Sequence, residues 1–285
     1  MGNGMWKVLA ALTVTLMSPV ALAAEEGDDA TGLTELMTAY DARGWEAVGK
    51  VSIGFGGMCT GALIETNIVL TAAHCLYDNR SGELVDPGQV QFHAGWRNGR
   101  ATATRNVRRA VVHPDYVFAP PSGELDTSDD LALLELNSEI RLASVTPFTT
   151  GKRPRKGQSV GVVSYAHDRD TSPSLQEVCH VLARQRGTLV LSCEVDFGSS
   201  GAPIFVEVDG TPQIVSVVSA MGDVRGRRVS LGTNLVKPLS ELRAILRTGG
   251  GMAAQSTLQA KTVKADKPRI RTFGGGGGGA KFVKP

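Results

Sequence analysis

The clearest chemical signal in the chain is a histidine that directly precedes a cysteine, at His74 and Cys75. A second cysteine, Cys59, lies 16 residues upstream, and the residues between the cysteines are strand-like. A disulfide between them would close a loop over this hairpin and hold the His74 backbone still. A general base must lie within about 3 Å of the hydroxyl that it deprotonates, so such a clamp would have a catalytic use. A single histidine is more often a buried structural residue, so other motifs must support this interpretation.

The surrounding sequence supplies that support. The segments Cys59-Thr60-Gly61-Ala62-Leu63-Ile64 and Thr71-Ala72-Ala73-His74-Cys75 resemble the histidine region of the trypsin/chymotrypsin-like serine proteases. The resemblance implies an all-β fold of two antiparallel six-stranded β-barrels, chymotrypsin-like, with a C-terminal helix. It also implies a Cys59–Cys75 disulfide and makes His74 the general base of a catalytic triad.

An aspartate ahead of an apolar strand matches the second member of this triad. The segment Asp130-Leu131-Ala132-Leu133-Leu134-Glu135-Leu136 resembles the D-[IL]-A-L-L-x-L segment of the family. Its carboxylate could be desolvated against an imidazole N–H, where it would fix the tautomer of His74. Asp129 competes for the role, but adjacent strand residues point to opposite faces, and the motif register selects Asp130.

A glycine-rich turn matches the third member. The segment Phe197-Gly198-Ser199-Ser200-Gly201-Ala202-Pro203 resembles the G-D-S-G-G-P turn of the family, which makes Ser200 the nucleophile. The resemblance assigns the oxyanion hole to the backbone N–H groups of Gly198 and Ser200. The order His74, Asp130, Ser200 along the chain is also the order in the family.

Two departures from the family motif indicate the branch. Ser199 replaces the aspartate that pairs with a new N-terminus in the animal digestive enzymes, and no I-V-G-G sequence occurs in this chain. We therefore expect a bacterial branch without the I-V-G-G activation terminus, in which local hydrogen bonds hold the turn. Ala202 replaces the second glycine, which is a small change.

The same resemblance identifies residues that would contact a substrate. Ser219 would lie beside the substrate backbone, and Ala220-Met221-Gly222 would form an edge strand that pairs with it. Glu194 would form an acidic pocket floor that favours Lys or Arg side chains by charge pairing. Cys193 does not occupy the cysteine position of the trypsin branch, so the register of this segment stays open.

The cysteine count favours disulfides over a metal site. The chain has four cysteines, which allow three pairings, and both Cys59–Cys75 and Cys179–Cys193 would be local. No C-x-x-C spacing occurs, so we expect no metal, and the inferred chemistry needs no cofactor.

The N-terminus resembles a secretory signal. Lys7 precedes an apolar run from Val8 to Leu16, and Ala21-Leu22-Ala23 fits an A-x-A cleavage site. The apolar run is short for a membrane span, although a retained anchor is the alternative. We therefore expect a secreted or periplasmic protein after cleavage following Ala23.

The remaining organisation follows from strand-like runs separated by turn residues. The last 37 residues hold seven Lys or Arg, one acidic residue and two glycine runs, which predicts a disordered tail. The expected divisions are a signal peptide at 1–23, an N-terminal extension or short propeptide at 24–43, a protease domain at 44–248 and the tail at 249–285. Within the domain we expect an N-barrel at about 44–148, a C-barrel at about 149–236 and a helix at 238–247.

These observations predict a secreted serine endopeptidase that hydrolyses peptide bonds through an acyl-enzyme, with a preference for Lys or Arg before the cleaved bond. Its partner would be a polypeptide substrate, with no nucleic acid and no membrane span in the mature chain, and we expect a monomer. The alternative is a catalytically inactive or latent trypsin-fold binding protein, which a broken triad would indicate.

Overall fold

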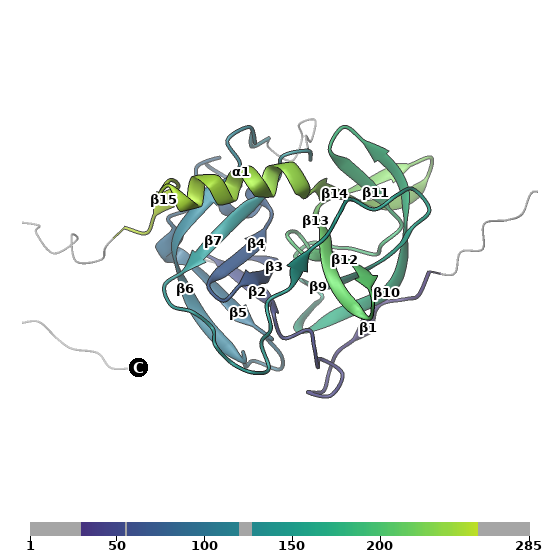
Figure 1. Ribbon diagram of the computed structural model, residues 1–285, viewed down its shortest axis with the longest axis horizontal. Helices are drawn as coiled ribbons and strands as arrows, with labels where there is room; N and C mark the ends of the chain where they lie inside the picture. The colour runs from purple at the N-terminus through teal and green to yellow at the C-terminus, as the bar shows by residue number, and fades with distance from the viewer. Residues whose placement is uncertain (1–29, 55, 120–126, 256–285) are drawn as a thin grey trace, which may run out of the picture.

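The computed structural model describes residues 30–54, 56–119 and 127–255. The expected signal peptide and the chain beyond residue 255 lie outside the described residues. Two β-barrels lie side by side, and a single long helix crosses the first of them (Figure 1). No helix in the described ranges is long and apolar enough to cross a membrane.

The first barrel, the N-barrel, is a ring of six antiparallel strands. The path runs β6-β5-β2-β3-β4-β7, and pairing of β6 with β7 closes it. β7 is buried along its whole length, which explains its mostly apolar sequence, and its one charged residue, Glu135, pairs with Arg108 and Arg109 of β6. The strands are β2 (Val48–Ile53), β3 (Gly57–Glu65), β4 (Ile68–Thr71), β5 (Val90–Ala94), β6 (Ala103–Val112) and β7 (Ala132–Leu136).

The second barrel, the C-barrel, repeats this plan. The path runs β10-β11-β14-β13-β12-β9, and pairing of β9 with β10 closes it. The short strand β8 (Thr149–Thr150) adds to β13 in parallel. The strands are β9 (Ser159–Ala166), β10 (Arg169–Gln185), β11 (Thr188–Leu191), β12 (Pro203–Val208), β13 (Thr211–Val224) and β14 (Arg227–Asn234). The predicted all-β, two-barrel fold is confirmed.

An aromatic cluster and polar contacts join the barrels. Trp45 meets Phe205 at 5.1 Å between ring centroids, and Phe148 meets Phe205 at 4.8 Å. The ammonium of Lys50 on β2 lies 2.8 Å from the carboxylate of Asp170 on β10. The relative position of the barrels matters because each contributes part of the site described below.

The helix belongs to the C-terminal part of the chain but packs on the N-barrel. α1 spans Val236–Arg247, two residues longer at its start than predicted. Leu239 and Leu242 of α1 belong to the same buried cluster as the N-barrel core. After the helix, β15 (Met252–Ala253) pairs with β6, and the Gln255 N–H donates to Asp86.

Two expectations about the chain ends need correction. The tail was predicted to be disordered from residue 249, but Met252 and Ala253 pair with β6, and the N–H groups of Ala254 and Gln255 donate to Arg108 and Asp86 of the N-barrel. The N-terminal extension was expected to lie outside the protease domain, yet β1 (Thr34–Glu35) forms within it because this segment pairs with β10 of the C-barrel. In both cases a distant strand edge outweighs local composition.

Candidate active site

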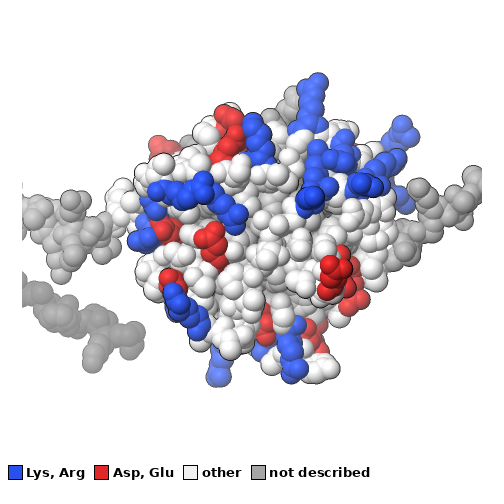
Figure 2. All heavy atoms as spheres, viewed as in Figure 1, with Lys and Arg blue, Asp and Glu red and all other residues white. Residues whose placement is uncertain are grey.

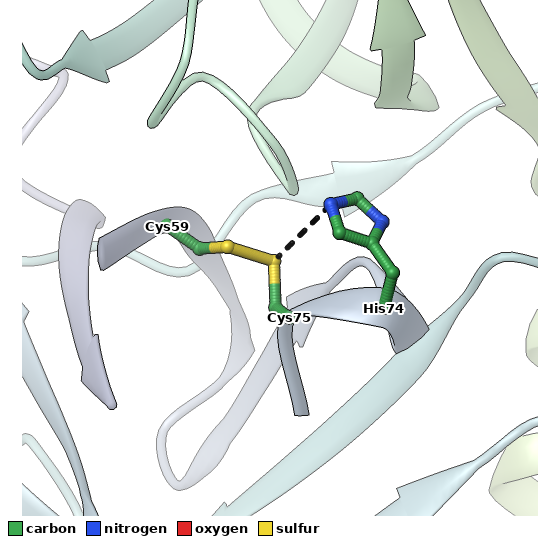
Figure 3. A group of neighbouring side chains, drawn as sticks. All are labelled: Cys59, His74 and Cys75. Atoms are coloured by element: carbon green, nitrogen blue, oxygen red, sulfur yellow. Dashed lines mark hydrogen bonds between the residues drawn. A yellow bond between two sulfur atoms is a disulfide. The ribbon is translucent and has the colours of Figure 1, made fainter. Parts of the chain in front are cut away.

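His74 lies in a short 3₁₀ helix, η1 (Ala73–Leu76), immediately after β4. The neighbouring Cys75 forms a disulfide with Cys59 on β3, with 6.3 Å between the two Cα atoms. Figure 3 shows the imidazole above this disulfide, with Nε2 3.9 Å from the Cys75 sulfur. The covalent link therefore fixes the backbone on the C-terminal side of His74, while Nδ1 faces away from the sulfur.

Asp130 fixes the other side of the imidazole. Its carboxylate is 3% exposed and lies 2.7 Å from Nδ1 of His74. The backbone N–H of His74 donates to the second carboxylate oxygen at 2.9 Å, and the Ser219 hydroxyl donates to the first. Three donors thus compensate a buried negative charge that would otherwise be costly.

The buried carboxylate also sets the acidity of the imidazole. Burial lowers the pKa of His74, but the charge of Asp130 and the hydrogen bond to it outweigh burial, so the pKa lies above its usual 6.5. A carboxylate on Nδ1 favours the tautomer that leaves Nε2 free to accept a proton. The pair can therefore act as a general base.

Asp129, the competing aspartate, points elsewhere. Its carboxylate lies 3.7 Å from Nδ1 of the buried His113, whose Nε2 lies 2.9 Å from the Glu241 carboxylate on α1. His113 therefore ties the loop before β7 to the helix. The structure brings Asp130, rather than Asp129, to His74.

The turn that carries Ser200 is anchored on the N-barrel. The Thr60 N–H donates to the Ser200 carbonyl at 2.8 Å, and the Thr60 hydroxyl donates to the Gly198 carbonyl at 2.9 Å. Because Thr60 follows Cys59, the partner of Cys75, these bonds bring the turn close to η1. Among the described residues, however, no hydrogen bond joins the Ser200 hydroxyl to His74. Bonds between nucleophile and base are often long in enzymes without substrate.

The predicted oxyanion-hole donors have free N–H groups. Within the described ranges, neither the Gly198 N–H nor the Ser200 N–H donates a hydrogen bond, whereas the Ser199 N–H between them donates to Asp196. Gly198 has a φ of +98°, a conformation that favours glycine and turns its peptide group. Two free donors beside the serine are what a developing oxyanion requires.

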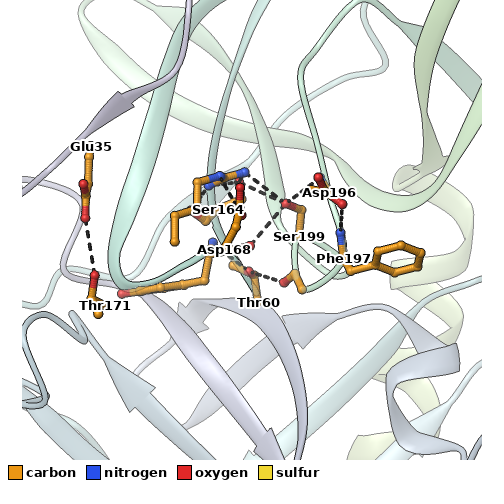
Figure 4. Close-up of polar contacts among 11 residues, drawn as sticks. Glu35, Thr60, Ser164, Asp168, Thr171, Asp196, Phe197 and Ser199 are labelled. Atoms are coloured by element: carbon orange, nitrogen blue, oxygen red, sulfur yellow. Dashed lines mark hydrogen bonds and ion pairs between the residues drawn. The ribbon is translucent and has the colours of Figure 1, made fainter.

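Ser199, which replaces the family's aspartate, is fully buried at the centre of a hydrogen-bond network (Figure 4). Its hydroxyl oxygen accepts from the Asp196 N–H at 3.2 Å and from Arg169 at 3.3 Å. The same hydroxyl lies 3.2 Å from the Tyr165 carbonyl and 3.3 Å from the Ser164 hydroxyl. Uncharged groups and one guanidinium therefore hold this turn.

A hollow of about 250 Å³ lies beside the turn, between residues 192–196 and the β13–β14 hairpin. Of the predicted substrate-binding residues, Glu194 and Met221 line it. Ala220 and Ser219 are not among its lining residues, and Ser219 instead bonds to Asp130. The Glu194 side chain is exposed, so it does not form a buried acidic floor.

Sequence reasoning missed several residues around this hollow. Leu33 comes from the N-terminal extension, Asp168 and Arg169 from the β9–β10 turn, and Arg228 and Val229 from β14. No local motif could reveal them, because each reaches the hollow through strand pairing with a distant segment. The basic run at 225–228 was the one available signal.

The second disulfide lies near the same hollow. Cys179 on β10 pairs with Cys193, with 5.0 Å between their Cα atoms. Cys193 lines the hollow, so the bond fixes the segment that leads to the serine turn. All four cysteines are therefore used in disulfides.

Among the described residues, two groups of side chains have metal-ligand chemistry, and each contains donor atoms that are already engaged. Cys59, His74 and Cys75 form one group, and both thiols are consumed by the disulfide. His113, Asp115 and Asp129 form the other, where Nδ1 of His113 accepts from the Asp115 N–H at 3.3 Å. Neither arrangement fits a metal without rearrangement.

These features have a counterpart among known proteins. A family model described as Trypsin matches residues 37–232, well over half of the chain. The chain therefore belongs to the trypsin family, the trypsin/chymotrypsin-like serine proteases, whose substrates are polypeptides.

Individual relatives match over shorter stretches. Transmembrane protease serine 7 of Homo sapiens is 33% identical over 138 residues, which cover 44% of this chain and 15% of the relative. Glutamyl endopeptidase of Bacillus licheniformis is 26% identical over 181 residues, which cover 62% of this chain and 53% of that protein. The chain thus spans only part of the length of both relatives.

A solved structure of a Glu endopeptidase in complex with MPD has the same fold. It superposes with a TM-score of 0.63 over 78% of this chain and 98% of the other, at 21% identity. The two-barrel architecture is therefore shared with that Glu endopeptidase.

Proposed function

We propose that this protein is a secreted serine endopeptidase that uses His74, Asp130 and Ser200 as its catalytic triad. The observation that carries the proposal is the fully compensated Asp130 carboxylate on Nδ1 of His74, which leaves Nε2 free to take a proton, whereas Nε2 of the structural His113 is engaged by Glu241. The serine turn of the other barrel is anchored beside it through Thr60.

The proposed reaction has two similar halves. Nε2 of His74 takes the Ser200 proton as the serine oxygen attacks the scissile carbonyl, and Asp130 stabilises the imidazolium. His74 then gives the proton to the leaving amine, which leaves an acyl-enzyme. Water repeats the sequence and releases the acid.

The backbone would stabilise the charge that develops on the substrate oxygen. The free N–H groups of Gly198 and Ser200 can both donate to it, and removing one such donor typically costs about 10²–10³ in rate. No metal or cofactor takes part in these steps.

For the residue before the cleaved bond, we propose Lys or Arg. Three carboxylates line the hollow, those of Asp168, Glu194 and Asp196, against the cations Arg169 and Arg228. Arg169 is engaged with Ser164 and Ser199, which reduces its attraction for an acidic substrate. The second candidate for this position is an acidic side chain. It is favoured by the exposed Arg228 and by the similarity to a relative named glutamyl endopeptidase. Cleavage of a peptide library that varies this one position would decide between them.

Export of the protein fits this activity. Two disulfides are compatible with an oxidising compartment outside the cytosol. We propose cleavage of the N-terminal signal after Ala23 and a secreted or periplasmic location, which N-terminal sequencing of the mature protein would test.

Labelling with a fluorophosphonate probe, followed by peptide mapping, tests the catalytic proposal. We expect the label on Ser200, and we expect Ser200→Ala and His74→Ala to lose nearly all turnover of casein while remaining folded. Ser240→Ala, an exposed serine on α1, serves as the control. The missing hydrogen bond between Ser200 and His74 favours the alternative, an inactive or latent binding protein, and an unlabelled chain would support it.

A further inference from the structure

A second and larger hollow lies on another face of the molecule, and we call it the linker groove. It has a volume of about 940 Å³ and lies between α1, the β12–β13 hairpin and the linker at 150–155. None of its lining residues belongs to the proposed triad, the oxyanion donors or the hollow at residues 192–196. The groove therefore requires a separate explanation.

Charges of one sign surround the linker groove. Five of its lining residues are cationic and none is acidic: Lys152, Arg153, Arg155, Arg243 and Arg247. Arg153 donates to backbone carbonyls of β10 and β11, and Arg243 lies 3.4 Å from Glu65. Lys152, Arg155 and Arg247 are exposed and form no ion pair with any described residue. Figure 2 shows Lys and Arg side chains on both sides of an uncharged area in the middle of this face, with smaller groups of Asp and Glu at the edges of that area.

The linker groove also includes apolar surface. Val208 is 41% exposed and Val236 is 55% exposed, and both line the groove. Val206, Val215 and Leu239 lie deeper in the same lining. Exposed valines flanked by free cations suit a ligand that carries both apolar groups and negative charge.

We propose that the linker groove is a docking site for an acidic segment of a partner polypeptide, whose aliphatic side chains cover the valines. A polyphosphate or sulfated glycan would match the cations but would leave Val208 and Val236 uncovered. The chain's own residues 256–285 carry seven basic residues and one acidic residue, so charge excludes them as the occupant. The proposal is independent of the triad, because docking requires no hydrolysis.

Fluorescence anisotropy can test this docking in the Ser200→Ala background, where the probe stays intact. The probe is a labelled 14-residue peptide of Glu, Asp, Leu and Val. Two comparison peptides replace the acids by Gln and Asn or the aliphatic residues by Ser, and a polyphosphate serves as the purely anionic competitor. We expect only the first peptide to bind, and we expect its affinity to fall as the salt concentration rises.

Matched variants localise the site. Arg155→Glu with Arg247→Glu should raise the Kd at least about tenfold through charge repulsion. Arg80→Glu with Arg100→Glu, which changes the net charge equally on the N-barrel, should leave it within about twofold. Val208→Ser with Val236→Ser should raise the Kd about threefold or more through lost apolar contact, whereas Val117→Ser with Leu142→Ser should not.

Three results would overturn the proposal. Equal weakening by both arginine pairs would show that the peptide senses net charge alone. Equal binding of polyphosphate or of the serine-substituted peptide would mean that the valines play no part. Tighter binding of a peptide of residues 24–31, which contains Glu25, Glu26, Asp28 and Asp29, would identify the occupant as this chain's own extension rather than a partner.

Discussion

The two halves of the proposed catalytic site are held by different kinds of interaction. On the N-barrel, a formal charge on Asp130 and a disulfide at Cys75 fix His74. On the C-barrel, hydrogen bonds around the buried Ser199 and close backbone contact with Thr60 fix the turn of Ser200. We therefore expect the half around His74 to be sensitive to changes in charge and pH. We expect the half around Ser200 to be sensitive to steric clashes and to lost hydrogen bonds.

The largest expected effect comes from removing the charge in the first half. Asp130→Asn should lower kcat by about 10⁴, because an amide favours the wrong tautomer of the imidazole. Asp129→Asn is the matched control, and its carboxylate faces His113 instead. Steady-state kinetics on a peptide substrate would measure both, and comparable losses would show that the charge is not specific to Asp130.

The second-largest expected effect tests the close contact between the serine turn and the N-barrel. A Cβ at Gly201, where φ is +80°, would lie 2.2 Å from the Thr60 carbonyl oxygen and 2.2 Å from the Thr71 hydroxyl. Gly201→Ala should therefore destabilise the fold by about 3 kcal/mol or more, from strain and overpacking together.

Gly99→Ala is the control for this strain. Gly99 has a similar φ of +78°, but a Cβ there meets nothing within 4 Å, so only about 1–2 kcal/mol should be lost. Urea denaturation would compare the two variants. Equal losses would mean that close approach of the turn to the N-barrel contributes nothing to stability.

A smaller effect is expected for the network around Ser199. Ser199→Ala removes the group that accepts from the Asp196 N–H and Arg169, and should cost about 1–3 kcal/mol because buried donors lose their partner. The variant should also lose activity, since the turn loses its anchor. The exposed Ser240→Ala should cost much less, and an unchanged unfolding midpoint for Ser199→Ala would contradict this role.

The smallest expected effect is a shift of the pH–activity profile to higher pH. Because the pKa of His74 is raised, activity should fall with decreasing pH around a midpoint above 6.5. The same shift contributes stability that is fully present below pH 6.5 and is lost as pH rises through the folded-state pKa. The pH dependence of kcat/KM measures the midpoint, and Ser199→Ala should leave it unchanged. A midpoint below 6.5 would mean that burial outweighs the charge of Asp130.

Local sequence predicted those features that depend on local pattern. Apolar runs such as that of β7 marked the strands, and the spacing of Leu239 and Leu242 marked α1 within two residues of its start. The motif register also separated Asp130 from Asp129, and their side chains do face different partners, although both residues precede β7 rather than lying in a strand.

Features that depend on distant pairing could not be predicted. Leu33 reaches the hollow at residues 192–196 only because β1 pairs with β10, and Arg169 reaches Ser199 only through the barrel geometry. The bond from Ser219 to Asp130 spans 89 positions. Such contacts follow from strand register, which composition and periodicity do not contain.

Each end of the described chain packs on the barrel that the other half of the chain forms, and this has a consequence for biosynthesis. The first described strand is fastened to the second barrel, while α1 and β15 return to the first. During synthesis, the N-barrel therefore cannot be completed until residue 253 has left the ribosome, although domains generally fold in the order of their synthesis. A chain severed in the linker would yield two fragments, each lacking a piece that the other carries.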